Sequence, residues 1–340
     1  MEKLNNILAA YGVFATQLEV ISERVVRVHD LYHQYALKRS HLTEKCVNRW
    51  LHVYHLSNHP HLSSIIPIYV TRDGKPYYKA GETVYYLMPW IESNREEVEQ
   101  REKLKQMYIS LAQIHAQTKF QYPLSSEEIV TTFQNYKSLC EKLPQTLRSY
   151  VEQFEANPYM SPFEWLVCTH YHKMLHVFQM SLQCVQRFID HHINKDNSWN
   201  VSLCHGQLDA SHALFGDQIY FINWERSRYE NSSLDLANFL KSRAVHVHEC
   251  PQKHAELFED YLRHHRLNES EIELLIMNVL DAHLYLTTVE QYVKQLSKQS
   301  LVQQVMELEQ TFRQLTFGLE FSEHVLQFYA SEFLDDDQKA

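Results

Sequence analysis

Most of the residues that could do chemistry lie in one stretch, residues 203–242, with the sequence LCHGQLDASHALFGDQIYFINWERSRYENSSLDLANFLKS. A His-Gly pair precedes Gln207, and Asp209 and His212 follow it. The amide of Gln207 has no titratable acceptor, so it cannot serve as a general base, whereas a carboxylate such as Asp209 can accept a proton. An imidazole such as His212 is a poor magnesium ligand, because magnesium prefers oxygen in near-octahedral geometry.

The second half of this stretch is a short apolar run, QIYFI, that ends at Asn223 and is followed closely by Glu225. Asn223 offers a neutral oxygen, and Glu225 offers a negative charge that could reach a metal. Two interpretations stay open: Asp209 and Glu225 act as a displaced base and metal ligand, or they form a turn and a salt bridge with Arg226 or Arg228. We favour the second, because displaced carboxylates seldom recover the geometry of in-line transfer.

The order and spacing of these residues resemble the aminoglycoside phosphotransferase and choline kinase branch of the protein-kinase-like fold. The signature of that branch is His-Gly-Asp-x-x-x-x-Asn, followed by an apolar strand that ends in Asp. The resemblance places Gln207 at the position of the catalytic Asp, and His212 and Asn223 at the two magnesium positions. It also implies that Lys38, in YALKR, contacts nucleotide phosphates and that Asp235, in DLANFL, braces the loop.

The nucleotide side of this predicted site is weakened as well. No glycine follows Gly12 before Lys38, so EVISERVVRVHD cannot form a glycine-rich phosphate flap. Glu44 is the only carboxylate on the next predicted helix and is the candidate partner of Lys38. A lost general base alone costs about 10²–10⁴ in rate. The sequence therefore favours a pseudokinase with no cofactor, and a nucleotide-binding sensor without turnover is a third possibility.

The alternative is an active phosphotransferase that uses ATP and magnesium to phosphorylate a sugar, an amino alcohol or an aminoglycoside-like molecule. In that case Lys38, Asp209 and Glu225 would act in altered roles. Binding of ATP that depends on magnesium would distinguish this alternative from a pure scaffold, since a ligand stabilises the fold that it binds.

Within this branch, the hairpin sequence TRDGKPY and the hinge sequence MPWIES most resemble the kinase-like spore coat proteins of the CotS type in Bacillus and its relatives. That resemblance implies a structural or scaffolding role in coat assembly, with other spore coat proteins as partners. It also implies synthesis in the mother-cell cytoplasm during sporulation, followed by deposition in the spore coat.

The composition is that of a globular protein large enough for two lobes: 340 residues, of which 44% are hydrophobic and 22% are charged. The net charge of −10 disfavours binding to nucleic acid. No uninterrupted apolar run approaches the ~18–20 residues that a membrane span needs, so no transmembrane segment is predicted. The six cysteines are scattered without CxxC spacing and predict reduced, mostly buried thiols.

The elements that must position these residues predict an α+β fold of the two-lobe, protein-kinase-like type. Residues 1–92 alternate in the manner of strands and predict a small antiparallel sheet with one helix at 42–59. Residues 93–340 predict a large, mainly helical lobe that contains the degenerate catalytic loop 203–225. The helices expected in that lobe are 95–119, 126–155, 163–194, 253–266, 270–296 and 301–331.

The 22 histidines raise the question of a metal site. His172 and His176 have the i, i+4 spacing of a ligand pair on a predicted helix. The sequence specifies no third ligand for them. We interpret them as solvated or hydrogen-bonded side chains.

Overall fold

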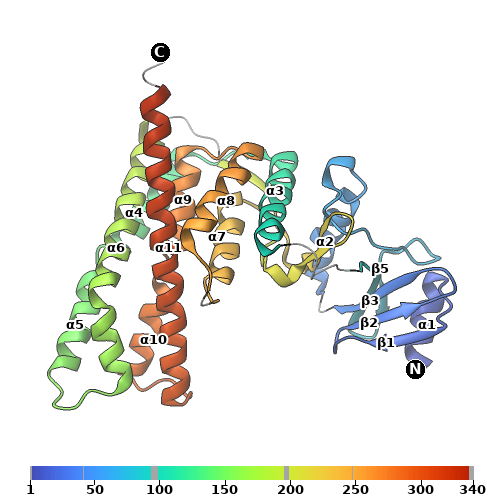
Figure 1. The fold of residues 1–340 in the computed structure, drawn as a ribbon, viewed down its shortest axis with the longest axis horizontal. Helices are drawn as coiled ribbons and strands as arrows, with labels where there is room; N and C mark the ends of the chain where they lie inside the picture. The colour runs from blue at the N-terminus through green and yellow to red at the C-terminus, as the bar shows by residue number, and fades with distance from the viewer. Residues whose placement is uncertain (1, 41, 93–98, 195–198, 247, 337–340) are drawn as a thin grey trace. The chain divides into compact units, whose positions relative to one another are not determined.

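The computed structural model describes residues 2–40, 42–92, 99–194, 199–246 and 248–336 (Figure 1). The chain divides into two compact units. The first consists of residues 1–118 and 203–229, and the second of residues 119–202 and 230–340. The segment that carries the candidate chemistry thus belongs to the same unit as the N-terminal sheet.

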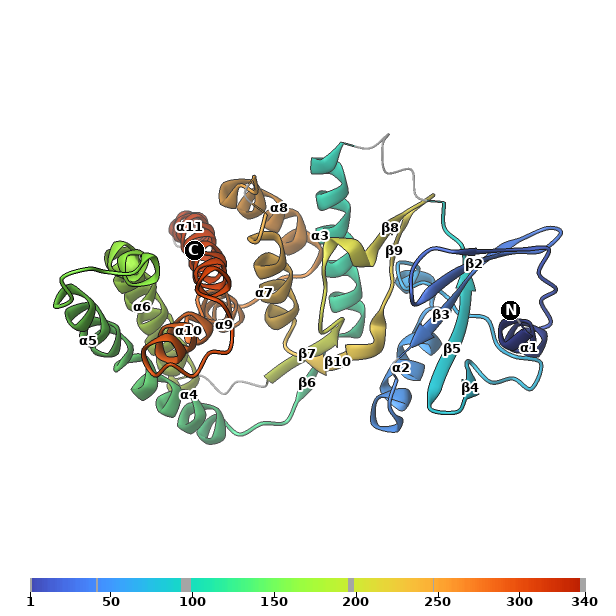
Figure 2. The ribbon, with the colours of Figure 1, turned by 90° about the horizontal axis from the view of Figure 1, so that it is seen from below.

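A five-stranded antiparallel sheet forms the framework of the first unit, with the strand order β1-β2-β3-β5-β4. In β3, Lys38 lies opposite Val25 of β2 and Tyr86 of β5. Figure 2 shows this sheet between α1 on one face and α2 on the other. The strands are β1 (Gln17–Val20), β2 (Val25–His29), β3 (Gln34–Ser40), β4 (Tyr78–Ala80) and β5 (Thr83–Pro89).

Alternation along the strands decides which side chains face each helix. The face under α1 (Glu2–Tyr11) carries an apolar cluster that includes Leu37, next to Lys38 in the chain. Lys38 therefore points to the opposite face, where Tyr86 packs against the fully buried Trp50 of α2 (Glu44–Leu56), with ring centroids 5.0 Å apart. The α1 cluster contains Ile7, Leu8, Val13, Val28, Tyr35, Leu37, Tyr85 and Leu87.

The hairpin that follows β7 (Trp199–Cys204) completes the first unit. Its two short strands, β8 (Ala213–Phe215) and β9 (Ile219–Phe221), pair in antiparallel register. A 3₁₀ turn stands on each side of them, η2 (Ala210–His212) before and η3 (Trp224–Arg226) after, and β10 (Arg228–Glu230) follows. The other elements of the unit are η1 (Pro60–Leu62) and α3 (Gln100–Thr118).

The unit boundary differs from the boundary at 92/93 that the sequence predicted. Here α3 and residues 203–229 cluster with the sheet. The reason is a long-range backbone connection: Phe221 N–H donates to the Ser64 carbonyl at 2.7 Å, and Ile65 forms a parallel bridge with Phe221. Backbone pairing of this kind has no signature in the local sequence.

The second unit is mainly helical. Two helices predicted as continuous are broken: Pro144 stands at the start of α5, where it cannot continue the hydrogen bonding of α4, and residues 280–282 separate α9 from α10. The short strand β6 (Phe120–Tyr122) pairs with the beginning of β7. The helices are α4 (Ser126–Cys140), α5 (Leu143–Glu155), α6 (Pro162–Asn194), α7 (Ser232–Arg243), α8 (Pro251–His264), α9 (Glu269–Val279), α10 (His283–Val293) and α11 (Leu301–Asp336).

The long helices α6 and α11 lie side by side in this unit (Figure 1). One apolar stretch of the described residues, Glu269–Val293, is long enough to cross a membrane, with a mean hydropathy of 1.3. Of the window tested, 67% is buried inside the protein, as expected of core helices. We take this stretch as weak evidence for a membrane span.

Candidate functional site

The centre of the site is the ammonium group of Lys38, which projects from β3 and is 8% exposed. Its Nζ donates a hydrogen bond to Glu225 Oε1 at 2.6 Å and a second one to Asn223 Oδ1. Burial lowers the pKa of Lys38, while the charge of Glu225 works in the opposite direction. The three side chains form one buried polar group, called here the Lys38 cluster.

Two neighbouring hydroxyl groups hold the carboxylate of Glu225 in place. Ser40 Oγ donates to Glu225 Oε1 at 3.1 Å, and Tyr86 Oη donates to the same oxygen at 3.0 Å. Burial alone would raise the pKa of Glu225, but the charge and hydrogen bond of Lys38 outweigh it and lower the pKa below its ordinary range. Glu225 is therefore an anion at neutral pH, and it lies directly beside Asn223.

The backbone conformation at Asn223 directs Asn223 Oδ1 and Glu225 Oε1 toward the Lys38 ammonium group. Asn223 has φ 70° and ψ 43°, a left-handed conformation that asparagine tolerates better than most residues. The turn η3 that follows is anchored by Trp224, whose side chain is fully buried and whose Nε1 donates to the Phe221 carbonyl at 2.9 Å. This sharp turn brings Glu225, two positions beyond Asn223, back to the Lys38 ammonium group.

A second set of contacts fixes the loop between β7 and β8. His205 is fully buried, and its Nε2 lies 2.8 Å from the Ile222 carbonyl. His212 Nδ1 donates to the Gln207 carbonyl at 2.8 Å, and the His212 ring stacks on His205 with centroids 5.2 Å apart. Burial lowers the pKa of His212, so its ring is neutral near pH 7. The Gln207 side chain is exposed.

Asp209 is a turn residue, as the favoured interpretation of the sequence had it. It caps the turn η2, where its side chain accepts a hydrogen bond from Ser211 N–H at 2.8 Å. One carboxylate oxygen is thereby committed to the backbone. This makes Asp209 a weaker candidate for a displaced base.

The salt-bridge partner predicted for Glu225 was wrong. Glu225 pairs with Lys38, 187 positions away, rather than with the neighbouring Arg226 or Arg228. This pairing matters for the chemistry. The carboxylate of Glu225 lies beside Lys38 and Asn223, where the favoured interpretation of the sequence placed no metal-binding carboxylate. Ser40 and Tyr86 were missed as site residues, and only their places beside Lys38 on the paired strands β3 and β5 could have indicated them.

Two other predicted roles stay predictions. Glu44 begins α2, but its side chain lies outside the described residues. Asp235 is buried in the first turn of α7, in the second unit, and its predicted role as a brace of the loop stays a prediction.

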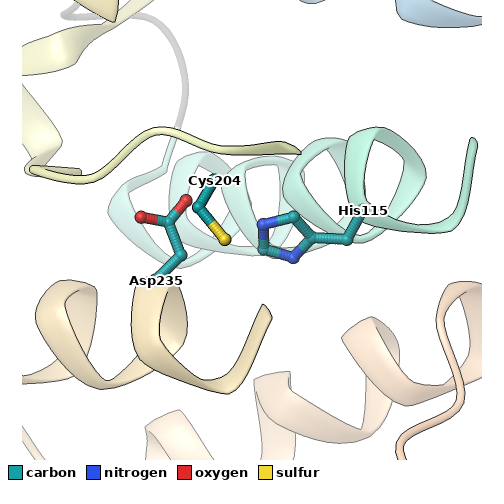
Figure 3. A group of neighbouring side chains, drawn as sticks. All are labelled: His115, Cys204 and Asp235. Atoms are coloured by element: carbon teal, nitrogen blue, oxygen red, sulfur yellow. The ribbon is translucent and has the colours of Figure 1, made fainter. Parts of the chain in front are cut away.

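A buried thiol and a buried imidazole lie close to this loop. Figure 3 shows Cys204, at the end of β7, and His115, in the last turn of α3, with their side chains directed toward one another. Both belong to the first unit. On α6, by contrast, His172 and His176 are exposed, and His176 Nε2 lies 3.8 Å from the carboxylate of Glu323.

The Lys38 cluster fits a magnesium–nucleotide group better than the sequence indicated. Asn223 Oδ1 and Glu225 Oε1 converge on one cation, the Lys38 ammonium, and both are the hard oxygen ligands that magnesium prefers. Magnesium in phosphate-transfer sites is commonly held by one or two carboxylates together with phosphate oxygens. Asn223 and Glu225 would hold the metal, and Lys38 would contact the phosphates.

Several solved structures share the fold of the chain. An aminoglycoside phosphotransferase from Alicyclobacillus acidocaldarius matches with a TM-score of 0.69 at 15% identity, over 95% of each chain. The AMP-bound complex of a spectinomycin phosphotransferase matches with a TM-score of 0.56 at 15% identity, over 94% of this chain and 98% of that one. A microcompartment-associated aminopropanol kinase matches with a TM-score of 0.53 at 11% identity, over 96% and 97%.

No protein-family model matches the chain, and no curated protein matches it. The structural matches establish the fold: this chain has the protein-kinase-like fold that these small-molecule phosphotransferases share, with a small antiparallel sheet and a mainly helical remainder. The predicted fold class is confirmed.

Proposed function

We propose that this protein is a small-molecule phosphotransferase that binds a magnesium–nucleotide through the Lys38 cluster. The observation that carries the proposal is the convergence of Asn223 Oδ1 and Glu225 Oε1 on the buried Lys38 Nζ. Bound magnesium would neutralise phosphate charge, which is the main requirement of phosphoryl transfer. The solved neighbours named above, all phosphotransferases or kinases of small molecules, support this function over a purely structural one.

His212 is the candidate acceptor for the proton of the substrate hydroxyl, because Gln207 has no titratable group. The Gln207 carbonyl can only accept a hydrogen bond, so Nδ1 of His212 carries the hydrogen and the lone pair lies on Nε2. Burial is the main cause that lowers the pKa of His212, and the charges of Lys38 and Glu225 make smaller, opposite contributions. The residue first assigned to a magnesium position would thus serve as the base.

Thermal denaturation with ATP, with and without magnesium, tests the binding step. We expect ATP to stabilise the protein when magnesium is present, by about 2.7 kcal/mol at 100 times the dissociation constant. Glu225→Gln should remove the part of the stabilisation by ATP that depends on magnesium. Asp217→Asn, which removes an exposed carboxylate from the β8–β9 turn, is the matched control and should keep it. Identical melting curves under all these conditions would contradict the proposal.

Assays of phosphate transfer to aminoglycosides, amino alcohols and sugars test the chemical step. We expect His212→Gln to lower kcat by about 10²–10⁴ and to abolish the acidic limb of the pH–rate profile, which should lie below the ordinary histidine pKa. Asp209→Asn should change neither kcat nor the pH–rate profile, because Asn also caps turns. Loss of activity in Asp209→Asn with retention in His212→Gln would assign the proton to Asp209 instead.

A second candidate function is a pseudokinase scaffold in the spore coat. It is favoured by one feature of the site, namely that Lys38, Asn223 and Glu225 satisfy one another without a ligand. The coat role itself is supported by the resemblance of TRDGKPY and MPWIES to the CotS-type proteins, with other coat proteins as partners. A fluorescent fusion should then move from the mother-cell cytoplasm to the forespore surface during sporulation, and a diffuse signal throughout would contradict it.

A further inference from the structure

A second pocket of the first unit lies apart from the Lys38 cluster. Asn48, Arg49 and His52 on α2 line one side of it, and Leu203 at the end of β7 lines the other. The segment Ser227–Tyr229, at the start of β10, completes the wall. The cavity has a volume of about 220 Å³, several times the share of about 30 Å³ that one water occupies in the liquid.

Two arginines, Arg49 and Arg228, line this pocket, and no carboxylate is among its lining residues in the described part of the chain. The guanidinium of Arg49 contacts Cys46 Sγ at 3.7 Å and has no carboxylate partner among the residues that the structure describes. A chain with a net charge of −10 thus keeps an uncompensated cation at the edge of a cavity.

Two of the other lining residues, Ser227 and Tyr229, carry hydroxyl groups. Ser227 is 2% exposed, and its hydroxyl has no hydrogen-bond partner within the described residues. Tyr229 Oη lies 2.9 Å from His52 Nε2, and burial raises the pKa of Tyr229, so the hydroxyl keeps its proton. A buried hydroxyl without a partner costs free energy, and a ligand that accepts its hydrogen bond removes that cost.

We propose that this pocket binds the phosphate group of a small organic phosphate. Phosphate offers several anionic oxygens, and the planar guanidinium of arginine binds such a group through paired hydrogen bonds. Arg49 and Arg228 supply the charge, and the hydroxyl group of Ser227 supplies a further donor. The volume leaves room for a short organic part beside the phosphate.

The pocket shares no residue with the Lys38 cluster, so the proposal does not depend on the proposed function. The pocket does adjoin the segments on either side of the loop and hairpin that carry the candidate chemistry. Ser227 directly follows η3, which carries Glu225, and Arg228 Nη1 lies 2.9 Å from the position that a Cβ on Gly206 would take.

Calorimetric titration with inorganic phosphate and with glycerol 3-phosphate tests the proposal in the full chain. We expect saturable binding of both, stronger for glycerol 3-phosphate, and at least tenfold weaker binding in the double variant Arg49→Gln/Arg228→Gln. Arg39→Gln removes an exposed arginine of β3 and is the charge-matched control. This variant should bind as the wild type does.

Three results would overturn the proposal: no saturable binding, an equal loss in Arg39→Gln, or wild-type binding by Arg49→Gln/Arg228→Gln. The first shows that the pocket does not take phosphate, the second that the binding is unspecific, and the third that the phosphate occupies another site. Urea denaturation of each variant, run beside the titrations, identifies a variant that binds weakly only because it is unfolded.

A readout on the unmodified protein comes from Cys46, next to Arg49. A hydrogen bond from Thr43 and, to a smaller extent, the contact with Arg49 lower the pKa of this thiol, which favours its alkylation. We expect glycerol 3-phosphate to slow the alkylation of Cys46 by iodoacetamide at least threefold, with no change at the exposed Cys250, when both are followed by peptide mass spectrometry. An unchanged rate at Cys46 under saturating ligand would contradict occupancy of this pocket.

Discussion

Lys38 and Glu225 form a buried ion pair between residues that are 187 positions apart. The side chain of Lys38 is 9% exposed and that of Glu225 is 21% exposed. At this burial, removing one partner strands the other charge in a poorly solvated place. The pair therefore contributes to the stability of the first unit as well as to the proposed chemistry.

We expect Glu225→Gln to lower the free energy of unfolding by about 3 kcal/mol at pH 7, at the low end for a buried pair because Glu225 keeps some contact with solvent. The effect should depend on pH. The folded state lowers the pKa of Glu225, so its contribution is complete above the unfolded pKa and is lost as the pH falls through the folded value. Urea denaturation between pH 7 and pH 3 measures both the loss of stability at pH 7 and its dependence on pH.

The variant curve should thus approach the wild-type curve at acid pH. Asp217→Asn is the control for removal of a carboxylate from the same hairpin, and it should change stability by less than about 0.5 kcal/mol. A constant difference between wild type and Glu225→Gln over the whole pH range would show that the ion pair does not titrate as described.

At the scale of elements, Gly206 shapes the loop after β7. It has φ +81°, and a Cβ at this position would lie 2.2 Å from the Arg226 carbonyl oxygen. The loop and η3 therefore approach each other more closely than any side chain allows. This approach of the two backbones helps to bring the loop with Gln207 and the turn with Glu225 together.

We expect Gly206→Ala to destabilise the first unit by more than about 3 kcal/mol, because it adds a backbone clash to a left-handed conformation that costs about 1–2 kcal/mol. Gly74→Ala is the matched control, since Gly74 has φ +74° and nothing within 4 Å of the added Cβ. Gly74→Ala should lower the free energy of unfolding only by the cost of the left-handed conformation, about 1–2 kcal/mol. Equal unfolding midpoints for the two variants would show that the loop can move away from η3.

A glycine also sets the packing of two helices in the second unit. A Cβ on Gly318 of α11 would lie 2.5 Å from Val279 Cγ1, at the end of α9. In an exposed helix the change to alanine would be stabilising by about 1 kcal/mol. We expect Gly318→Ala to destabilise instead, by about 1–3 kcal/mol of overpacking.

The double variant Gly318→Ala/Val279→Ala should recover part of this loss, because the methyl group that clashes is gone. Urea denaturation of both single variants and the double variant gives the coupling free energy. Strictly additive effects would contradict a direct contact between the two side chains.

At the scale of the whole molecule, the two units should respond differently to nucleotide, if the proposed function holds. We expect magnesium and ATP to slow amide hydrogen exchange in β3, β9 and η3, since these elements carry Lys38 and Glu225 or support them. The amides of α5 in the second unit should exchange at an unchanged rate. Equal slowing everywhere would indicate a general stabilisation without a defined site.

The sequence alone determined the class of fold and named Lys38, Asn223 and Glu225 as candidates for the site. Strand alternation before residue 92 and helical periodicity after it predicted the two types of structure, because these periods are local properties of the chain. The spacing from Gln207 to His212 and on to Asn223 indicated the loop and hairpin in the same way. The capping role of Asp209 was also accessible, since it depends on the next two residues only.

Only the tertiary structure decided which of these residues meet. The pairing of Lys38 with Glu225, the hydroxyl groups of Ser40 and Tyr86 beside it, and the membership of residues 203–229 in the first unit all depend on contacts between distant segments. The physical reason is that a left-handed turn at Asn223 and the backbone bond from Phe221 to Ser64 set the position of Glu225, and neither leaves a periodic pattern in the sequence.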